Sequence, residues 1–352
     1  MNPVDEAGAM RAGEELDASR LGAYLMEHFA DLELPLQLQQ FHSGFSNLSY
    51  LLTAGHRHLV LRRPPVGTRP KSGHDMYREF RVLSALRPAF GECPQALHYC
   101  ADESVIGTPF YVVERIRGII LRRDYPPELA STPALVRAQQ TALIDVLVRL
   151  HEVDYRAAGL DDLGRPDGYV GRQVRGWTER YVRAQTADAP PADGVTSWLA
   201  ANLPPESRRA ALIHNDYKLD NVVFDLREPE HLIGVLDWEM ATIGDPLMDV
   251  GCSLAYWIEA GDAAEMQATR MLPTQLPGSL SRTEFLMRYS QARGISVDDF
   301  RFYRVFGLFR LAVITQQIYY RYYHRQTGDA RFSALGPMTQ VLVRRAEAEA
   351  RA

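Results

Sequence analysis

The chain has 352 residues, of which 46% are hydrophobic and 24% charged. This length exceeds what one hydrophobic core usually organises, so we expect a globular protein with two lobes. Acidic residues number 44 against 39 lysines and arginines, a balance that excludes an overall electrostatic grip on nucleic acid. No apolar run approaches about 18 residues, and the N-terminus has no basic region followed by an apolar one. We therefore expect a cytoplasmic protein without a membrane partner.

Short strand patterns dominate the first third of the chain. Apolar spacing predicts a leading helix over residues 21–32 and a second helix over 74–87, which Pro88 ends. Between and after these helices, β-type patterning predicts five strands, at residues 36–41, 49–54, 58–62, 96–101 and 108–116. Because the second and third strands are separated only by a tight turn at Gly55 and His56, we expect an antiparallel meander.

Helical periodicity dominates the rest of the chain, as in TALIDVLVRLHEV at residues 141–153. One strand-like island interrupts it, running from ALIHND through NVVFD to HLIGVLDW at residues 211–238. The order of strands first and helices after predicts an α+β fold with a smaller N-terminal lobe, residues 1–115, and a larger, mainly helical lobe, residues 116–352.

The island carries polar residues suited to phosphoryl transfer. The octet HNDYKLDN, residues 214–221, places a carboxylate at Asp216, an ammonium at Lys218 and an amide at Asn221. A carboxylate can orient an attacking hydroxyl and accept its proton, and a cation can neutralise the transferring phosphoryl group. We therefore predict Asp216 and Lys218 as catalytic residues.

A hairpin is predicted to bring two oxygen ligands together. Two apolar runs flank a polar turn containing Pro229, so Asn221 before the first strand and Asp237 after the second should lie close to each other. Mg²⁺ prefers oxygen ligands and is commonly held by one or two carboxylates together with substrate phosphates. Asn221 and Asp237 are therefore the predicted metal ligands.

These residues resemble the catalytic and metal-binding loops of the protein-kinase superfamily. The pattern H-x-D-x-x-x-x-N is met at His214, Asp216 and Asn221, whereas Asp-Phe-Gly is replaced by Asp237, Trp238 and Glu239. The segment LDWEMATIGDPLMDVG, residues 236–251, resembles the aminoglycoside phosphotransferase branch, whose members include small-molecule kinases. The segments LVLRRPP, YREFRVLSAL, RQVRGW, LPTQLPG and FGLFRLAVI are similar to phosphotransferases related to the kinase domain fused to acyl-CoA dehydrogenases.

The resemblance implies a protein-kinase-like two-lobed fold and a nucleotide site in the N-terminal lobe. It assigns a nucleotide-covering loop to Ser43, Gly44, Ser46 and Asn47, and a hinge that holds the purine to Glu114 through Ile116. Arg62 stands where the family has a phosphate-binding lysine, and Glu79 is its expected ion-pair partner. ATP and Mg²⁺ are the implied cofactors.

Structural roles compete with functional ones at several other positions. We expect His214 to support the loop without transferring a proton, Asp245 to cap a helix that begins after it, and Asp249 to brace the catalytic loop through backbone N–H groups. The aromatic and basic segment at residues 304–325 should mainly pack in the core, although Arg310, Tyr319 and Arg321 are candidates for reaching an anionic substrate.

Three functions remain open from the sequence. The first is a kinase that transfers the γ-phosphoryl group of ATP to a hydroxyl of a small molecule. Resemblance to the fused kinase domains suggests a hydroxyacyl thioester or hydroxy acid as acceptor and a functional link to an acyl-CoA dehydrogenase. The second is an aminoglycoside or macrolide phosphotransferase. The third is a nucleotide-binding pseudokinase module, favoured by Arg62 but opposed by the complete set of Asp216, Lys218, Asn221 and Asp237.

Overall fold

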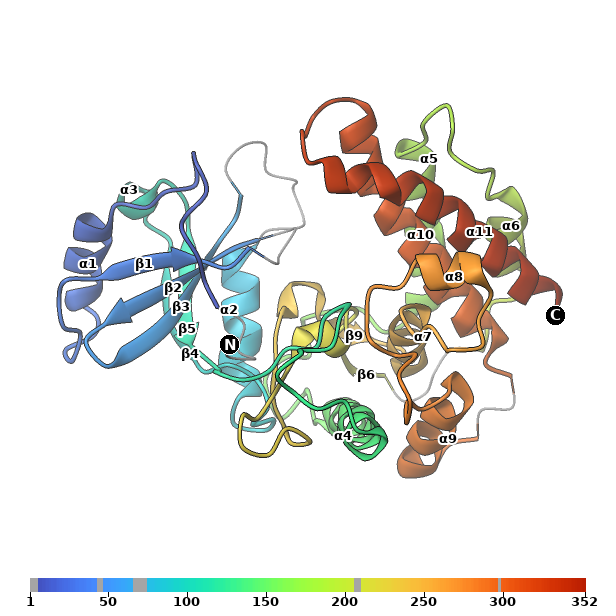
Figure 1. Cartoon of the computed structure of the whole chain (residues 1–352), viewed down its shortest axis with the longest axis horizontal. Coiled ribbons are helices and arrows are strands. Elements are labelled where there is room, and N and C mark those ends of the chain that lie inside the picture. The colour runs from blue at the N-terminus through green and yellow to red at the C-terminus, as the bar shows by residue number, and fades with distance from the viewer. Residues whose placement is uncertain (1–5, 43–46, 66–74, 206–209, 297–298) are drawn as a thin grey trace. The chain divides into compact units, whose positions relative to one another are not determined.

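A computed structural model describes residues 6–42, 47–65, 75–205, 210–296 and 299–352 (Figure 1). The chain forms two compact units. The first contains residues 1–120, 156–160 and 221–241, and the second contains residues 121–155, 161–220 and 242–352. The division into functional lobes between residues 115 and 116 stays a proposal.

The first unit is built on a five-stranded antiparallel sheet, whose first three strands confirm the predicted meander. Its strand order is β1-β2-β3-β5-β4. The strands are β1 (Gln37–Gln40), β2 (Leu48–Ala54), β3 (Arg57–Arg63), β4 (Ala96–Cys100) and β5 (Phe110–Glu114). The tight turn between β2 and β3 is possible because Gly55 adopts a positive φ of 58°.

The two faces of this sheet are covered by different helices (Figure 1). Helix α1 (Ala18–Met26) packs Leu21 and Leu25 into a cluster with Phe110 and Val112 of β5. Helix α2 (Met76–Leu86) covers the other face, and the short α3 (Glu103–Ile106) follows β4. Because side chains alternate along a strand, Arg62 points to the face opposite that of Leu61, beside its register partner Tyr111.

The leading helix is shorter than predicted. Helix α1 ends at Met26, whereas the periodic pattern continues to Leu32. Leu32 is nevertheless buried, and Phe29 packs against the same cluster as α1. The apolar pattern therefore identified buried residues correctly. Its last positions, however, lie in the non-helical chain that follows α1.

A second sheet element of the first unit is the hairpin of β7 (Val222–Phe224) and β8 (Leu232–Val235), which confirms the predicted hairpin. Ile119 forms an antiparallel bridge with Phe224. The approach requires a glycine at position 118, because a Cβ there would lie 2.3 Å from the Phe224 carbonyl oxygen. The 3₁₀ turn η2 (Trp238–Met240) follows β8.

The second unit is mainly helical, as predicted, with one short antiparallel strand pair. The pair joins β6 (Ala211–Ile213) to β9 (Thr242–Gly244), and β9 lies beyond the predicted strand-like island at residues 211–238. The 3₁₀ turn η1 (Leu219–Asn221) ends the octet at residues 214–221, and the division between the units falls within this turn, after Asp220. The helices are α4 (Pro133–Glu152), α5 (Tyr169–Arg183), α6 (Asp193–Ala201), α7 (Pro246–Ala255), α8 (Ala264–Ala268), α9 (Arg282–Arg293), α10 (Arg301–Tyr323) and α11 (Leu335–Arg351), with the turn η3 (Ala330–Ala334).

Helices α7 and α10 approach each other through two glycines. A Cβ at Gly307 would lie 2.1 Å from the carbonyl oxygen of Gly251, and one at Gly251 would lie 2.4 Å from the carbonyl oxygen of Tyr303. Backbone therefore packs directly on backbone at this crossing. Among the helices of the described residues, none is long and apolar enough to cross a membrane.

Candidate functional site

In the first unit, Arg62 lies between two acidic side chains. Its Nη1 donates to Oε1 of Glu79 at 2.9 Å, which confirms the predicted ion pair. Its Nη2 donates to Oδ1 of Asp237 at 2.8 Å. Glu79 also accepts the backbone N–H of Trp238 at 3.1 Å. Strand β3, helix α2 and the loop after β8 are thus joined at one guanidinium.

Glu239 brings a third carboxylate toward the same guanidinium. Its Oε2 lies 3.9 Å from Nη2 of Arg62 and accepts a hydrogen bond from Nδ2 of Asn47 at 2.6 Å. Asn47 is the one predicted residue of the nucleotide-covering loop that the structure describes. Ser43, Gly44 and Ser46 lie outside the described residues. The sequence contained Glu239 within the Asp-Trp-Glu motif, but gave no reason to connect it with Asn47.

Three carboxylates around one guanidinium leave an excess of negative charge. Burial lowers the pKa of Arg62, but the charges of Glu79, Asp237 and Glu239 outweigh that effect and raise it. Burial raises the pKa of Glu79 against the opposing effect of Arg62. An additional cation beside these carboxylates would therefore be electrostatically favoured.

Asp237 and Asn221 meet at the open end of the β7–β8 hairpin. The backbone N–H of Leu236 donates to the carbonyl oxygen of Asn221 at 2.8 Å, so Asp237 is the residue directly after the one that pairs with Asn221. Asp237 has left-handed backbone angles, φ 68° and ψ 60°. Such a conformation is uncommon outside glycine and recurs at functional sites. No three His, Cys, Asp or Glu side chains in the described ranges are grouped to hold a metal ion by themselves.

The predicted hinge follows the last strand of the sheet in chain order. Glu114 ends β5, is exposed, and donates its backbone N–H to the carbonyl oxygen of Gln95 at 3.0 Å. Ile116 is partly buried against Gly234 of β8, where a Cβ would clash with its side chain at 2.7 Å. The purine-binding role of Glu114 and Ile116 stays a prediction.

In the second unit, Lys218 bridges two carboxylates of the catalytic octet. Its Nζ lies 2.9 Å from Oδ2 of Asp216 and 3.0 Å from Oδ1 of Asp220. Burial disfavours the charge on Lys218, but these two carboxylates outweigh burial and raise its pKa. Burial raises the pKa of Asp220, against the effect of Lys218. Lys218 is therefore held as a cation beside Asp216.

Tyr256, at the C-terminal end of α7, holds the other side of Asp216. Its hydroxyl donates to Oδ1 of Asp216 at 3.4 Å, and its ring lies 5.6 Å from Nζ of Lys218. Burial and the nearby Asp216 raise the pKa of Tyr256, so its phenol is a neutral donor. The sequence offered no signal for this role, because Tyr256 stands within an apolar run.

Asp249 braces the catalytic loop, as predicted. Its carboxylate accepts the backbone N–H groups of His214 at 2.7 Å and Asn215 at 2.8 Å. His151 contacts the same carboxylate through Nε2 at 3.2 Å. Asn215 has a positive φ of 65°, a conformation that these bonds help to fix. The loop that carries Asp216 is therefore held from within its own unit.

The other structural predictions for this unit are also confirmed. His214 is fully buried and accepts the backbone N–H of Asp216 through Nδ1 at 3.2 Å, a supporting contact. Asp245 caps α7 by accepting the backbone N–H of Leu247 at 2.9 Å. Among the candidates for an anionic substrate, Tyr319 bonds Asp188 at 2.7 Å, and Arg321 is exposed. Arg310 is buried.

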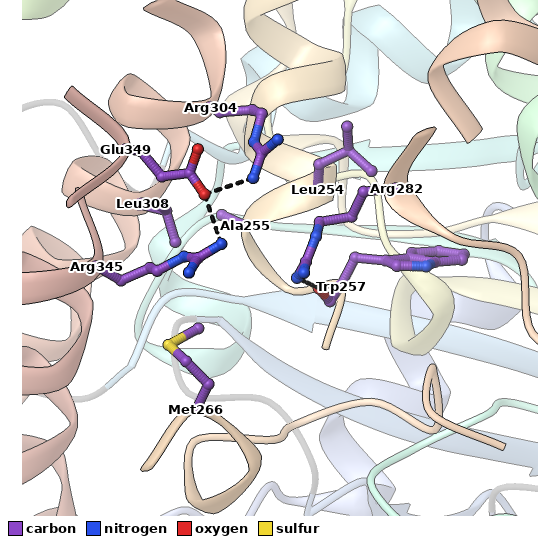
Figure 2. A pocket seen from close by; sticks show the side chains of 9 residues that line it. All are labelled: Leu254, Ala255, Trp257, Met266, Arg282, Arg304, Leu308, Arg345 and Glu349. Atoms are coloured by element: carbon purple, nitrogen blue, oxygen red, sulfur yellow. Dashed lines mark hydrogen bonds and ion pairs between the residues drawn. The ribbon is translucent and has the colours of Figure 1, made fainter. Parts of the chain in front are cut away.

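A separate pocket in the second unit contains none of the predicted site residues (Figure 2). Its cavity is small, about 20 Å³ in volume. Arg304 and Arg345 converge on Glu349, at 2.5 and 2.6 Å, while Arg282 pairs with Asp262 at 2.5 Å. Glu259 lies 3.3 Å from Arg282, so three arginines are matched by three carboxylates. This charge balance suits a structural network.

Comparison with known proteins identifies relatives over most of the chain. The phosphotransferase enzyme family matches residues 37–285. The mouse acyl-CoA dehydrogenase family member 10 is 37% identical over 308 residues, covering 87% of this chain but 28% of the relative. The human acyl-CoA dehydrogenase family member 11 is 35% identical over 315 residues, covering 88% of this chain and 40% of the relative. The chain thus spans well under half the length of these curated relatives.

Solved structures agree with the fold. A Ralstonia eutropha protein solved as a candidate aminoglycoside phosphotransferase has a TM-score of 0.79 and 29% identity, with 96% of this chain and 99% of that chain covered. A spectinomycin phosphotransferase in complex with ADP and spectinomycin has a TM-score of 0.60 at 12% identity, covering 95% and 98%. The latter supports the two-lobed kinase-like fold alone. From the family match and the relatives above 30% identity, the chain belongs to the phosphotransferase enzyme family.

Proposed function

We propose that this protein transfers the γ-phosphoryl group of ATP to a hydroxyl of a small hydroxy acid or hydroxyacyl thioester in the cytoplasm. The observation that carries the proposal is the Asp216 carboxylate, held by Lys218 at 2.9 Å on a loop that Asp249 braces. A binding module would have no need to fix a carboxylate and an ammonium in this way. The family membership supports the reaction class.

In the proposed reaction, Asp216 orients the acceptor hydroxyl. The acceptor oxygen forms a bond to the γ-phosphorus while the bond from that phosphorus to the β–γ bridging oxygen breaks, so ADP leaves. The hydroxyl proton passes to Asp216. Lys218 stabilises the negative charge near the transferring group, since its own charge is secured by two carboxylates.

Asn221 and Asp237 are the residues that would hold Mg²⁺. The excess of carboxylates around Arg62 fits a further cation there, and an amide and a carboxylate fit the preference of Mg²⁺ for oxygen. When bound, the metal would neutralise charge on the nucleotide phosphates. Arg62 would orient Asp237 and, through its second Nη, keep helix α2 attached to the same loop.

Nucleotide use is supported by the solved relative that contains ADP. We propose that the purine lies against Glu114 through Ile116, and that the segment ending at Asn47 covers the phosphates. The hydrogen bond from Asn47 to Glu239 would then connect the covering segment to the loop that carries Asp237. This arrangement gives Asn47 a role that its side chain performs before any nucleotide is bound.

The acceptor class rests on the relatives named as acyl-CoA dehydrogenases. Phosphate is a far better leaving group than hydroxide. A phosphorylated hydroxyacyl compound is therefore prepared for elimination to an unsaturated one, which links such a kinase to acyl-chain oxidation. The aminoglycoside and macrolide acceptors stay the alternative, since solved relatives of this fold include enzymes named for them.

The test is Mg²⁺-dependent conversion of ATP to ADP with hydroxy acids, hydroxyacyl-CoAs, aminoglycosides and macrolides as acceptors, with the phosphorylated product identified by mass spectrometry. We expect ADP and a phosphoester of a hydroxy acid or its thioester in equal amounts. Turnover with aminoglycosides alone would replace the proposed acceptor. Nucleotide binding without turnover of any acceptor would instead support the hypothesis of a pseudokinase module.

A further inference from the structure

Two arginines of the second unit lie against the same indole. The guanidinium carbon of Arg180 is 4.6 Å from the ring centroid of Trp177, and that of Arg310 is 4.9 Å from it. Trp177 and Arg180 are on α5, whereas Arg310 is on α10, which packs against α5. Trp177 is buried, so its indole is enclosed by protein. The indole contacts the exposed guanidinium of Arg180 and the buried guanidinium of Arg310.

The buried cation interacts electrostatically with Asp216, the carboxylate that we propose as catalytic. Arg310 is only 2% exposed. Burial lowers the pKa of Arg310, but Cys252, Tyr256 and Asp216 together outweigh burial and raise it. The neighbours other than Asp216 are neutral, because burial raises the pKa of the Cys252 thiol to about 11 and raises that of Tyr256 further. Arg310 and Lys218 therefore both place positive charge near Asp216.

The exposed Arg180 forms no ion pair among the described residues, and the charge of Glu179 offsets only part of the repulsion that it meets. Its sequence neighbour Glu179 pairs instead with Arg183, at 2.7 Å. Partial burial and the repulsion of Arg310 lower the pKa of Arg180. Two like charges on one ring repel each other, and an anion placed beside them would relieve that repulsion. Guanidinium groups suit such a ligand, since their donors match a carboxylate or phosphate and their planes stack on aromatic rings.

We propose that Arg180, Trp177 and Arg310 form a subsite for an anionic group of the phosphoryl acceptor. The exposed Arg180 makes the direct contact, while the buried Arg310 orients Trp177 and adds positive potential toward Asp216. The subsite selects a hydroxyl compound that carries a carboxylate or phosphate and rejects a polycationic aminoglycoside. This inference rests on the proposed function for the identity of the acceptor.

The wild-type protein alone can overturn the proposal through a series of matched acceptors that differ in charge. The series is 3-hydroxybutyrate, its neutral amide and the cationic 4-aminobutan-2-ol. A fourth compound, 3-hydroxybutyryl-CoA, has no free carboxylate and carries its negative charge on phosphate groups instead. Binding is measured by calorimetry and transfer by ADP release. We expect the acid or the CoA thioester to exceed the amide by about 10- to 100-fold, as for hydrogen bonds to charged groups. Equal values for all four compounds would overturn it.

Variants then assign any preference to the named residues. Arg180→Gln should remove most of the preference for the anion and leave the amide within about three-fold, because a surface arginine contributes little else. Arg310→Gln should also lower the preference for the anion, together with transfer to every acceptor because its charge acts on Asp216, and Arg310→Lys should restore part of the preference. The matched control is Arg183→Gln, one turn further along α5 and paired with Glu179. The subsite would be refuted if the preference for the anionic acceptor stayed unchanged in both Arg180→Gln and Arg310→Gln. It would also be refuted if that preference fell equally in the Arg183→Gln control.

The outcomes separate this subsite from the proposed function. Anion binding that depends on Arg180, without phosphoryl transfer to any compound, would uphold the subsite and refute the kinase. Transfer that ignores acceptor charge would uphold the kinase and refute the subsite. If Arg310→Gln does not fold, as judged by thermal melting, the wild-type series and the exposed Arg180→Gln variant still decide the question.

Discussion

Arg62 donates to Oδ1 of Asp237 at 2.8 Å, so the residue predicted to bind phosphate also holds a predicted metal ligand. The same guanidinium pairs with Glu79, which is 1% exposed. Removing one partner of a buried ion pair leaves an uncompensated charge. A substitution at Arg62 should therefore reduce folding stability as well as activity.

Arg62→Met is expected to lower the free energy of unfolding by about 3–5 kcal/mol, as for other broken buried pairs. Arg62→Lys should lose less, since it retains the charge but can no longer reach two carboxylates with separate nitrogens. Urea unfolding followed by circular dichroism measures both. The control is Arg57→Met on the same strand, whose pair with Asp31 is exposed and should be worth about 0–1 kcal/mol. Equal losses at both positions would contradict the assignment.

The brace at Asp249 predicts a dependence of stability on pH. Burial works to raise the pKa of Asp249, but the hydrogen bond and charge of His151, with the N–H of His214, outweigh burial and hold the pKa below its ordinary value. The folded pKa thus lies below the unfolded one. The stabilisation is complete above about pH 4 and is lost as the pH falls through the folded pKa.

Asp249→Asn tests this brace. At neutral pH the variant should be less stable by about 1.5–3 kcal/mol, the usual cost of a hydrogen bond to a charged group. The difference from wild type should shrink as the pH falls below about 4, because the carboxylate of the unfolded wild-type chain is protonated there while the folded one stays ionised down to its lower pKa. Urea titrations from neutral pH to about pH 3 give both values. A constant difference over that range would show that the charge of Asp249 has no part in the brace.

Tyr256→Phe should separate the hydroxyl from the ring. The ring can stay beneath Lys218, whereas the hydrogen bond to Oδ1 of Asp216 is lost. We expect kcat to fall by about 3- to 30-fold, with the KM for ATP unchanged, because a neutral hydrogen bond contributes roughly 0.5–1.5 kcal/mol and more with a charged partner. Steady-state kinetics test this. An increase in KM for ATP with constant kcat would place Tyr256 in nucleotide binding instead.

The contact between α7 and α10 predicts a stability effect away from the chemistry. Gly307→Ala would place a methyl group 2.1 Å from a backbone oxygen of Gly251, so the helices must move apart. The expected loss is about 1–3 kcal/mol, as for other overpacked sites. Gly328→Ala is the control, because a Cβ there meets nothing within 4 Å. Thermal melting that is equally insensitive to both changes would contradict the close contact.

The sequence predicted the fold and the motif-bearing loops because their signals are local. Alternating apolar residues specify the five-stranded sheet, and the spacing of Asp216, Asn221 and Asp237 is read within one segment. The Arg62–Glu79 ion pair was also predicted, because Glu79 lies in the helix that follows the strand of Arg62. Family resemblance supplied the roles of these residues.

Other parts could not be predicted because they depend on contacts between distant segments. Tyr256 reaches Asp216 only through the placement of α7, and Glu239 reaches Asn47 across 192 positions. Arg310 looked like one of several basic residues on an aromatic helix until its packing against Trp177 was known. Pattern and propensity carry no information on such pairs.

The most direct test of the account is phosphoryl transfer by Asp216→Ala. With Mg²⁺, ATP and a hydroxy acid or its CoA thioester, the wild-type protein should form ADP and the phosphoester in equal amounts. The variant should bind ATP as tightly but turn over about 10²- to 10⁴-fold more slowly, as expected when a general base is removed. Undiminished transfer by the folded variant would contradict the assignment of Asp216 and the mechanism built on it.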